Sequence, residues 1–474
     1  MHFRCFSRLP MTIDSSWLAC MKSDAPDAFT PEPPFDPNGV FIDGQIRLMC
    51  PTSADRVQTW DDYVVGQFER CITKYFRAGV RGVVIAFDDY THVPAAKSMT
   101  QIKRRRHLPT VEFSDRSQLP PTVPTGEQWA ACISNRTFKT VVIKMVIDQL
   151  IRRVPGMLTE TQSLIVDYQG PPMEYTRDGE RMLDDFESLG EADVKFPRYT
   201  KMFPYLQVDS IDGDSVPIAL LRVERLLNGG DHPIGTFNVS VKRMVTRIPE
   251  TSAEKKARAA ETAARAEAEA SRKRKAGDSD GKAWQPKREY EFLDVMRLYG
   301  VLVQNVLIPL RSACGDGVRR GVRGSEMQVL VGAIGLTGTD FTRGVPHVGA
   351  KSLYDMLQDL WPKFTSAYDA KAERFESGRY LNGVVAGVYY EKFNKHCHGG
   401  NLRSVLSALR ESKLSERTKG MLPDLSTLEC TANNVNWLLQ YWLRACDDTT
   451  QQYPDPVQEC YGYKCVKGKV GFVA

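Results

Sequence analysis

The sequence predicts an α/β protein built on a mostly parallel β-sheet flanked by helices. The first observation is spacing: an apolar run at 40–44, a helical pattern at 60–78 and a second apolar run at 82–87 follow one another. Strand, helix and strand in this order form the βαβ unit of a parallel sheet. The second observation is that both runs end in acid, at Asp43 and Asp88. Open α/β sheets place their ligand sites at the carboxyl ends of strands.

Length and composition are those of a globular protein. The chain of 474 residues is long enough for two or three domains, or for one large α/β domain with additions. Its 63 Lys and Arg against 58 Asp and Glu give a net charge of +5, which does not by itself indicate nucleic acid. Eleven scattered cysteines without a CxxC pair, no signal peptide and no apolar run of roughly 18 residues predict a soluble intracellular protein with no membrane partner.

The segments around the first two strands have simpler interpretations. Residues 1–10 are expected to be an unstructured leader, and an amphipathic segment begins at Met11. After the second strand, residues 94–106 are strongly basic, and Lys97 and Arg104 would share one helical face. This segment is either a solvated basic surface or a set of phosphate contacts beside the acids. Residues 107–135 are expected to be loop.

A helix is expected over 138–153 and a third strand over 164–167, before the acidic stretch at 190–220. That stretch holds five carboxylates: Glu191, Asp193, Asp209, Asp212 and Asp214. Its second half reads as a turn that leaves a buried strand and enters a helix. Carboxylates clustered at a strand end repel one another unless a cation lies between them, and oxygen ligands suit Mg²⁺ or Mn²⁺. The alternative is a polar turn with solvated acids, which is the role we expect for Asp209.

A change of composition marks the middle of the chain. Residues 234–245 suggest a strand, but residues 251–289 are mostly Ala, Glu, Lys and Arg and have no apolar face. We expect an exposed or disordered insertion there. Its Arg272–Lys275 run is either a nuclear import signal, a nucleic-acid patch or a solvated charged linker. From Tyr290 the periodicity of apolar residues indicates a helix that includes residues 292–306.

A glycine turn follows a further helix expected at 327–336. Gly344 and Gly349 bracket this turn, and a new helix is expected over 350–360. A glycine turn that opens a helix presents backbone N–H groups to phosphate, and Lys351 adds positive charge. The alternative is an ordinary helical hairpin.

Taken in order, these motifs resemble those of the flap endonuclease/XPG-like superfamily of structure-specific 5′ nucleases. GLTGTDFTRGVPHVGAKSL at 335–353 resembles the family's LLGSDY…GIGPK segment, in which an acid leads into a helix–two-turn–helix that grips duplex DNA. FIDG and VVIAFDD resemble the family's VAIDAS and VFDG strands, GEAD resembles its EAE acids, and SIDGD resembles its ED-x-D step. The resemblance implies a PIN-like (Rossmann-like) core that carries seven carboxylates in family order: Asp43, Asp88, Glu191, Asp193, Asp212, Asp214 and Asp340.

The resemblance also implies a function. Two Mg²⁺ ions, for which Mn²⁺ can substitute, would be held by these acids and used to hydrolyse phosphodiester bonds in branched or flapped double-stranded DNA during replication, repair or recombination. The pattern P-x-x-K-S-x₄-K-R resembles the family's gateway helix, where the matching Lys97 and Arg104 would stabilise the scissile phosphate. The implied nucleic-acid contacts are Lys97, Lys103, Arg104, Arg105, Gly344, Gly349 and Lys351. An RNA-degrading 5′–3′ nuclease of the same superfamily, a Holliday-junction resolvase and a non-catalytic binding scaffold remain alternatives.

The resemblance covers about residues 11–360 and suggests a division of the chain. The expected parts are an N-terminal leader and segment (1–37), a nuclease core (38–250) with a gateway or arch region at about 89–189, the charged insertion (251–289), the end of the core with the helix–two-turn–helix (290–360) and a mostly helical C-terminal region (361–474). Three departures from the family pattern bear on substrate preference: Asp193 replaces a glutamate, Pro197 should disturb the helix that follows the acids, and His347 stands where glycine is common. The Arg272–Lys275 run favours a nuclear over a cytoplasmic location.

Overall fold

The computed structural model describes a large part of the chain. The described residues are 15–49, 59–89, 119–183, 190–210, 212–229, 235–244, 290–312, 324–339, 344–393, 400–447, 463–466 and 469–472. Several sequence-based expectations lie outside them: the leader before residue 15, Lys97, Lys103, Arg104, Arg105, the 251–289 insertion with Arg272–Lys275, and Asp340.

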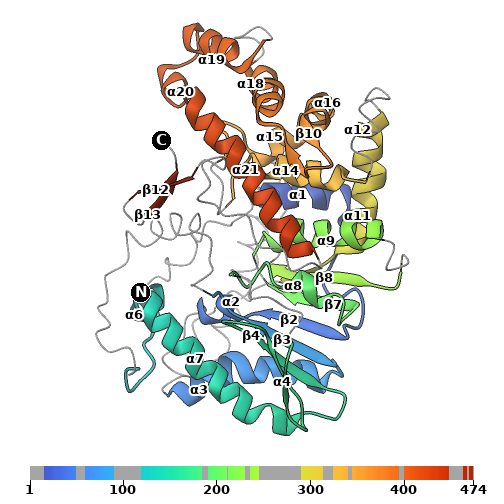
Figure 1. Ribbon diagram of the computed structural model, residues 1–474, viewed down its shortest axis with the longest axis vertical. Coiled ribbons are helices and arrows are strands. Elements are labelled where there is room, and N and C mark those ends of the chain that lie inside the picture. Colours follow the sequence, from blue (N-terminus) through green and yellow to red (C-terminus); the bar gives the residue numbers. More distant parts are fainter. Residues whose placement is uncertain are drawn as a thin grey trace, which may run out of the picture.

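Within the described residues, a nine-stranded sheet runs through the molecule in the order β1-β9-β8-β7-β2-β3-β4-β5-β6 (Figure 1). The central strands are all parallel: β8 (Asn238–Met244), β7 (Tyr205–Asp209), β2 (Gly39–Asp43), β3 (Gly82–Ala86) and β4 (Ser163–Asp167). The edge strands are antiparallel: β9 (Tyr290–Asp294) and β1 (Phe29–Thr30) on one side, β5 (Met173–Tyr175) and β6 (Glu180–Met182) on the other. The parallel sheet predicted from the βαβ spacing is therefore confirmed for the centre.

Helices cover both faces of the sheet (Figure 1). Val83 and Ile85 of β3 face one helical layer, and Val84 and Ala86 face the other, because successive strand residues point to opposite faces. The first layer contains α3 (Trp60–Val64), η2 (Val65–Glu69), α4 (Arg70–Arg77), α6 (Gly126–Ser134) and α7 (Arg136–Arg153). The second contains α1 (Ser15–Asp24), α8 (Phe196–Tyr199), α9 (Ser215–Gly229), α11 (Val295–Leu302), α14 (Glu326–Gly335) and α21 (Leu425–Cys446). Burial on both faces explains why the central strands are continuous apolar runs.

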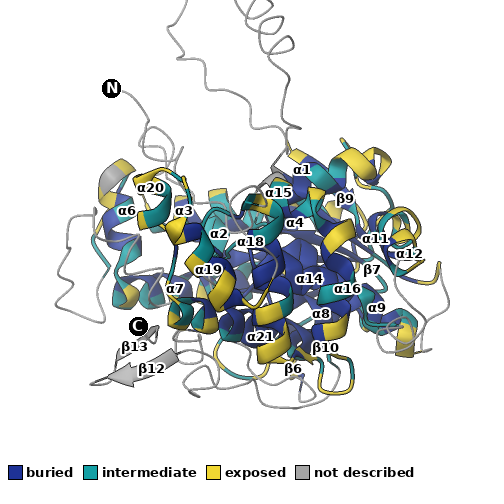
Figure 2. Cartoon of the chain, turned by 90° about the horizontal axis from the view of Figure 1, so that it is seen from above, coloured by how far each residue is buried: buried dark blue, intermediate teal, exposed yellow. Residues whose placement is uncertain are grey.

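The described residues of the C-terminal part of the chain are mostly helical and extend the second layer. Helix α14 lies in its interior, where every residue from Met327 to Gly335 is buried, and it appears dark blue in Figure 2. Trp437, Tyr441 and Trp442 of α21 are at most 1% exposed, so the prediction that they belong to the core is confirmed. The remaining elements here are η4 (Val303–Leu307), α12 (Ile308–Ser312), α15 (Ala350–Asp355), α16 (Leu357–Ala367), β10 (Tyr368–Asp369), β11 (Arg374–Phe375), α17 (Ser377–Arg379), η5 (Tyr380–Val385), α18 (Ala386–Phe393), α19 (Leu402–Glu411), α20 (Glu416–Gly420), β12 (Tyr463–Val466) and β13 (Lys469–Phe472).

Three expectations are wrong in their details. The segment 107–135 was expected to be loop, but α6 forms within it because Trp129 and Ile133, four residues apart, are both buried. The helix expected from Tyr290 begins only at Val295, after β9, and the Asp294 side chain caps it by accepting from the Arg297 amide at 3.0 Å. The single helix expected over 350–360 is two helices, α15 and α16, which meet at Met356.

A buried acid joins α9 to α14. Glu224 is 2% exposed, and its Oε1 accepts a hydrogen bond from the Met327 amide at 3.0 Å. Burial is the main cause that raises the pKa of Glu224 to about 8, and the nearby Glu326 carboxylate raises it too. Hydrogen bonds from Met327 and Gln328 and the charge of Arg225 lower it by less. Folding therefore takes up a proton at this carboxyl near neutral pH.

We expect Glu224→Gln to stabilise the protein by an amount that grows with pH. The pKa of about 8 in the folded protein exceeds the ordinary value of 4.5. Between these two pH values the free energy of unfolding of the wild type therefore falls by about 1.4 kcal/mol per pH unit. Glutamine keeps an acceptor for the Met327 amide and cannot ionise. Urea unfolding of both proteins at about pH 5 and about pH 8 measures the effect. A difference between the two proteins that is the same at both pH values would contradict it.

Candidate functional site

The carboxyl edge of the sheet brings together acids from four segments of the chain. Asp43 is the last residue of β2, Asp88 follows β3, Asp193 lies between β6 and α8, and Asp212 lies in the turn between β7 and α9. Burial, together with the carboxylates of Asp88, Asp193 and Asp212, raises the pKa of Asp43 well above its ordinary value. Three of the seven acids predicted from the sequence thus act electrostatically on a fourth, Asp43, in the folded chain.

Local contacts fix the orientation of Asp43. Its Oδ1 accepts a hydrogen bond from the Gln45 amide at 2.9 Å, and the Ser210 hydroxyl lies 3.4 Å from its Oδ2. Gly44 allows the chain to turn closely against β3, because a Cβ at this position would lie 2.8 Å from the Ala86 carbonyl oxygen. The glycine and the two hydrogen bonds hold the end of β2 against the ends of β3 and β7.

Hydrogen bonds also join the loop after β3 to the segment that carries Glu191 and Asp193. The Ala192 amide donates to Asp88 Oδ1 at 3.0 Å, and the Asp89 amide donates to the Gly190 carbonyl at 2.6 Å. Two of the predicted acidic motifs, VVIAFDD and GEAD, are therefore directly bonded to each other although about a hundred residues separate them. Glu191 is fully buried and Asp193 is 5% exposed.

The strand–turn–helix predicted around Asp212 and Asp214 is confirmed. Strand β7 ends at Asp209 and α9 begins at Ser215. In the turn, the Asp212 amide donates to Ser210 Oγ at 3.3 Å and the Asp214 amide donates to Asp212 Oδ1 at 3.2 Å. This turn bonds to Asp43 through Ser210, so it belongs to the same site.

Asp209 is not a solvated turn residue, and that expectation is wrong. It ends β7, is 6% exposed, and accepts from Arg47 at 2.8 Å, from Tyr75 at 2.9 Å and from Lys242 at 3.2 Å. Burial opposes its ionisation, but Lys242 and Arg47 lower its pKa below the ordinary value. Strand alternation places it on the α4 face, opposite to Asp43. Its three partners lie far from it in the sequence, so no local pattern could predict that they bond to this carboxylate.

The acid at the end of β4 was also missed. Asp167 is fully buried and pairs with Lys195 Nζ at 3.0 Å and with Arg198 Nη2 at 2.6 Å, while the Tyr199 hydroxyl donates to it at 2.7 Å. Burial opposes its ionisation, but Arg198 and Lys195 lower its pKa. The one available signal was its position, since Asp167 ends the third strand as Asp43 ends the first. The helix that Pro197 was expected to disturb is the four-residue α8, which carries Arg198 and Tyr199.

The segment that follows α14 folds back on itself. The Val345 amide donates to the Leu336 carbonyl at 2.8 Å. A Cβ at Gly344 would lie 2.5 Å from the Thr337 carbonyl oxygen, so only glycine allows this close approach. His347 has a φ of 66°, in the left-handed region that favours glycine, at the position where the resembling family pattern commonly has glycine. The tight turn predicted between two helices is therefore present.

The charged end of this turn is exposed. Gly349 precedes the first residue of α15, and Lys351 Nζ lies 3.1 Å from Asp355 Oδ2 in a pair whose side chains are 67% and 58% exposed. An exposed pair of this kind contributes little to stability and leaves Lys351 accessible to another anion. Asp340, the seventh predicted acid, lies outside the described residues, so its position relative to Asp43 is not part of this geometry.

The acids at the sheet edge suit a divalent cation in chemistry and in charge. All are oxygen donors of the kind that Mg²⁺ and Mn²⁺ prefer, and a cation would relieve the repulsion that raises the pKa of Asp43. Among the described residues, however, no three Asp, Glu, His or Cys side chains are grouped so that they could hold a metal ion as they stand. The carboxylates would have to turn toward a bound ion.

Comparison with known proteins gives no match in sequence and a distant likeness in structure. No protein-family model matches the chain. No curated protein matches it either. Among solved structures, the chain is similar to the catalytic core of Rad2 in complex with a DNA substrate, at 15% sequence identity and a TM-score of 0.37, over 94% of this chain and 91% of that chain. Because the identity and the TM-score are low, the function proposed below rests on the residues of this chain.

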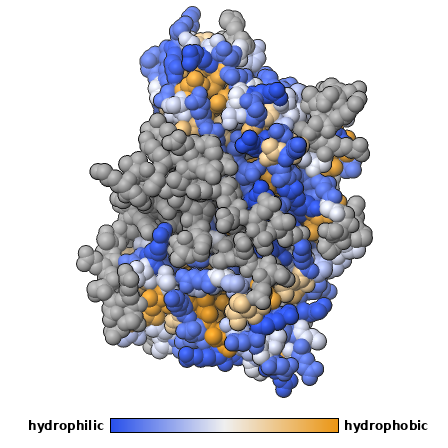
Figure 3. Space-filling view, viewed as in Figure 1, coloured by the Kyte–Doolittle hydropathy of each residue, from blue (hydrophilic) through white to orange (hydrophobic). Residues whose placement is uncertain are grey.

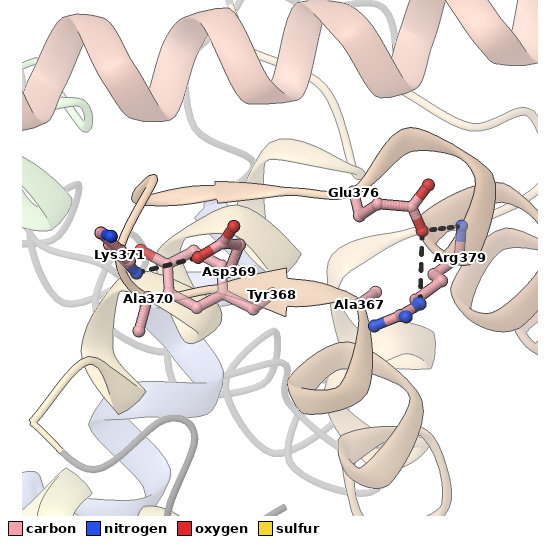
Figure 4. A pocket seen from close by; sticks show the side chains of 7 residues that line it. All are labelled: Ala367, Tyr368, Asp369, Ala370, Lys371, Glu376 and Arg379. Atoms are coloured by element: carbon pink, nitrogen blue, oxygen red, sulfur yellow. Dashed lines mark hydrogen bonds and ion pairs between the residues drawn. The ribbon is translucent and has the colours of Figure 1, made fainter.

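The surface away from the acids offers a shallow pocket of about 610 Å³ on the β10–β11 hairpin (Figure 4). Its two carboxylates are bonded within its own wall: the Lys371 amide donates to Asp369 at 3.0 Å and the Arg379 amide donates to Glu376 at 2.9 Å. It is lined by Ala367, Tyr368, Asp369, Ala370, Lys371, Glu376 and Arg379. None of these residues belongs to the predicted site.

No helix among the described residues is long and apolar enough to cross a membrane. The described surface on the face shown in Figure 3 is largely hydrophilic, and its hydrophobic areas are separate from one another.

Proposed function

We propose that the chain is a metal-dependent nuclease that hydrolyses phosphodiester bonds, with structure-specific 5′ cleavage of flapped or branched DNA as its activity. The observation that carries this proposal is the meeting of acidic segments at the carboxyl edge of the sheet, where Asp88, Asp193 and Asp212 act electrostatically on the buried Asp43 and hydrogen bonds join their loops. Four acids this close, three of them buried and Asp212 half-buried, are costly in a structural site and useful in a metal site. Each of these acids also matches an acid of the resembling nuclease motifs.

The predicted site residues form three groups: acids on one side of the site, acids on the other side, and two basic residues that would face the substrate phosphate. Asp43, Asp88, Glu191 and Asp193 would hold cations on one side of the site, and Asp212, Asp214 and Asp340 on the other. Bound Mg²⁺, or Mn²⁺ in its place, supplies an activated water and stabilises the leaving oxygen. Lys97 and Arg104 would stabilise negative charge that develops on the scissile phosphate. The Gln45 and Ala192 amides, which donate to Asp43 and Asp88, would limit how far these carboxylates must turn to reach a bound ion.

The segment from α14 to α15 would bind the duplex. Its folded turn ends at an exposed glycine and lysine, which suit the phosphate backbone and carry no sequence information. In this proposal α14, the turn and α15 serve as the helix–two-turn–helix of the resembling family. Gly344 and Gly349 would shape the turn and Lys351 would contact a phosphate.

Lys351→Ala should weaken duplex binding in a salt-dependent way. Loss of one phosphate contact should reduce the slope of log affinity against log salt by about 0.9, measured by fluorescence anisotropy on duplex DNA across a salt series. Asp355→Ala should act in the opposite direction, because Asp355 competes with phosphate for Lys351. Arg379→Ala is a matched control, since Arg379 is an exposed cation that also pairs with an acid of its own segment. An unchanged slope in Lys351→Ala would exclude the turn from the DNA contact.

One assay separates the candidate functions. Labelled 5′-flap, nicked, four-way-junction and single-stranded RNA substrates are incubated side by side with the protein and Mg²⁺, and with EDTA as the control. We expect Mg²⁺-dependent cleavage of the 5′ flap. Cleavage of the junction alone would favour a resolvase, degradation of RNA alone would favour a 5′–3′ ribonuclease of the same superfamily, and binding without any cleavage would favour a non-catalytic scaffold.

A further inference from the structure

A buried lysine lies between the segments that carry the acids. Lys195 is fully buried, although lysine is rarely buried completely in proteins. Its Nζ lies 2.8 Å from the Phe87 carbonyl oxygen, 3.3 Å from the Asp167 carbonyl oxygen and 3.0 Å from Asp167 Oδ1. An ammonium group has three donors, and these three acceptors can use all of them.

The acceptors connect three parts of the site. Phe87 directly precedes Asp88, Asp167 ends β4, and Lys195 itself lies two residues after Asp193. The Lys195 side chain therefore ties the segment of Asp193 to the ends of β3 and β4. The bonds from the Ala192 amide to Asp88 and from the Asp89 amide to Gly190 join the same two loops on the other side of Asp88.

Packing alone does not account for a lysine at this position. Removing an ammonium group from water costs several kcal/mol, and a well-packed apolar side chain in place of a buried ion is often neutral or stabilising. What an apolar side chain cannot do is bond to two strand-end carbonyls and so fix where the chain leaves β3 and β4. Side chains of a metal site must be held to within about 0.5 Å, which requires such support.

We propose that Lys195 is a positioning residue that sets Asp88 and Asp193 for cation binding. The inference rests on the proposed function, because it requires that the acids bind a metal. It assigns Lys195 no contact with the ion or the substrate. Its effect passes through the backbone of Phe87 and through the segment that leads back to Asp193.

The test measures Mn²⁺ binding to the full-length, metal-free protein by electron paramagnetic resonance, without nucleic acid. Lys195→Met should remain folded, because Asp167 keeps Arg198 as a counter-charge. We expect its Mn²⁺ affinity to fall about 10- to 100-fold, as is usual when a residue that supports metal ligands is lost. Arg198→Met is the control: it removes a cation from the same carboxylate but leaves the bonds from Lys195 to the Phe87 and Asp167 carbonyls, so its Mn²⁺ affinity should fall clearly less than that of Lys195→Met. Circular dichroism confirms folding of each variant.

The outcomes separate this inference from the proposed function. Wild-type protein that binds no Mn²⁺ overturns the metal site and the role of Lys195 with it. Wild-type protein that binds Mn²⁺, with Lys195→Met folded and binding equally well, overturns the role of Lys195 alone. Equal losses in Lys195→Met and Arg198→Met would assign the effect to the buried charge cluster as a whole and also overturn it. If Lys195→Met does not fold, Lys195→Arg replaces it, since a guanidinium cannot occupy a compact ammonium site; unchanged Mn²⁺ affinity in that variant overturns the inference.

Discussion

Asp43→Asn should abolish Mg²⁺-dependent cleavage and, at the same time, stabilise the metal-free protein. Loss of one metal-binding carboxylate removes several kcal/mol of transition-state stabilisation. The cleavage rate should therefore fall by at least about 10²- to 10³-fold. Binding of the nucleic acid should change little, since the duplex contacts lie elsewhere. Single-turnover cleavage of a 5′-flap substrate and anisotropy titration of the same substrate measure the two quantities separately.

The gain in stability follows from the sign of the pKa shift. The pKa of Asp43 is raised in the folded protein by burial and by Asp88, Asp193 and Asp212, so an ionised Asp43 costs free energy above its ordinary pKa. Asparagine removes that charge, and its side-chain oxygen can still accept from the Gln45 amide. Without metal, the melting temperature of Asp43→Asn should exceed that of the wild type.

Added Mg²⁺ should reverse this order. A ligand that binds only the folded state stabilises it, so Mg²⁺ should raise the melting temperature of the wild type and not that of Asp43→Asn. Asp359→Asn, at an exposed acid of α16, is the control and should show neither effect. Cleavage by Asp43→Asn at the wild-type rate would remove Asp43 from the catalytic site, and a wild-type melting temperature independent of Mg²⁺ would argue against a metal site.

The centre of the fold could be predicted because its signals are local. Apolar runs such as 82–86 are buried on both faces of a parallel sheet, and helical periodicity marked α7 and α14 within a few residues of their bounds. The antiparallel edges could not be predicted in this way. Strand β6 is three exposed residues, and β9 runs directly into α11, so neither has a periodicity that separates it from its surroundings.

The site was predictable where an acid follows a strand and unpredictable where a residue acts through distant partners. Asp43 and Asp88 end or follow strands whose order could be inferred, so their meeting could be anticipated. Asp209 has the same local setting as Asp43, but strand alternation turns it to the other face, where Arg47 and Lys242 neutralise it. A shift of one residue along a strand moves a side chain to the opposite face of the sheet, and this difference gives Asp209 and Asp43 different roles. No sequence motif indicates which face each of them takes.

Asp167→Asn should be among the most destabilising single changes in the chain. It would leave Lys195 and Arg198 buried beside each other without their shared carboxylate, and removing one partner from a buried ion pair costs about 3–5 kcal/mol. Glu373→Gln is the matched control, because the Arg225–Glu373 pair is about a quarter exposed and its loss should cost less than about 1 kcal/mol. Urea unfolding near neutral pH measures both.

The pH dependence of the stability of Asp167→Asn distinguishes the loss of a charge interaction from a packing defect. The pKa of Asp167 is lowered below its ordinary value of 3.8 in the folded protein, so its stabilisation is present above that value and is lost as the pH falls through the folded pKa. The difference between wild type and Asp167→Asn should therefore shrink in acid, whereas a packing defect would persist. Lys195→Met should be milder than Asp167→Asn at neutral pH, because it leaves one cation for one carboxylate. The reverse order of stabilities would show that the cluster is held by the lysine's bonds to the strand-end carbonyls more than by its charge balance.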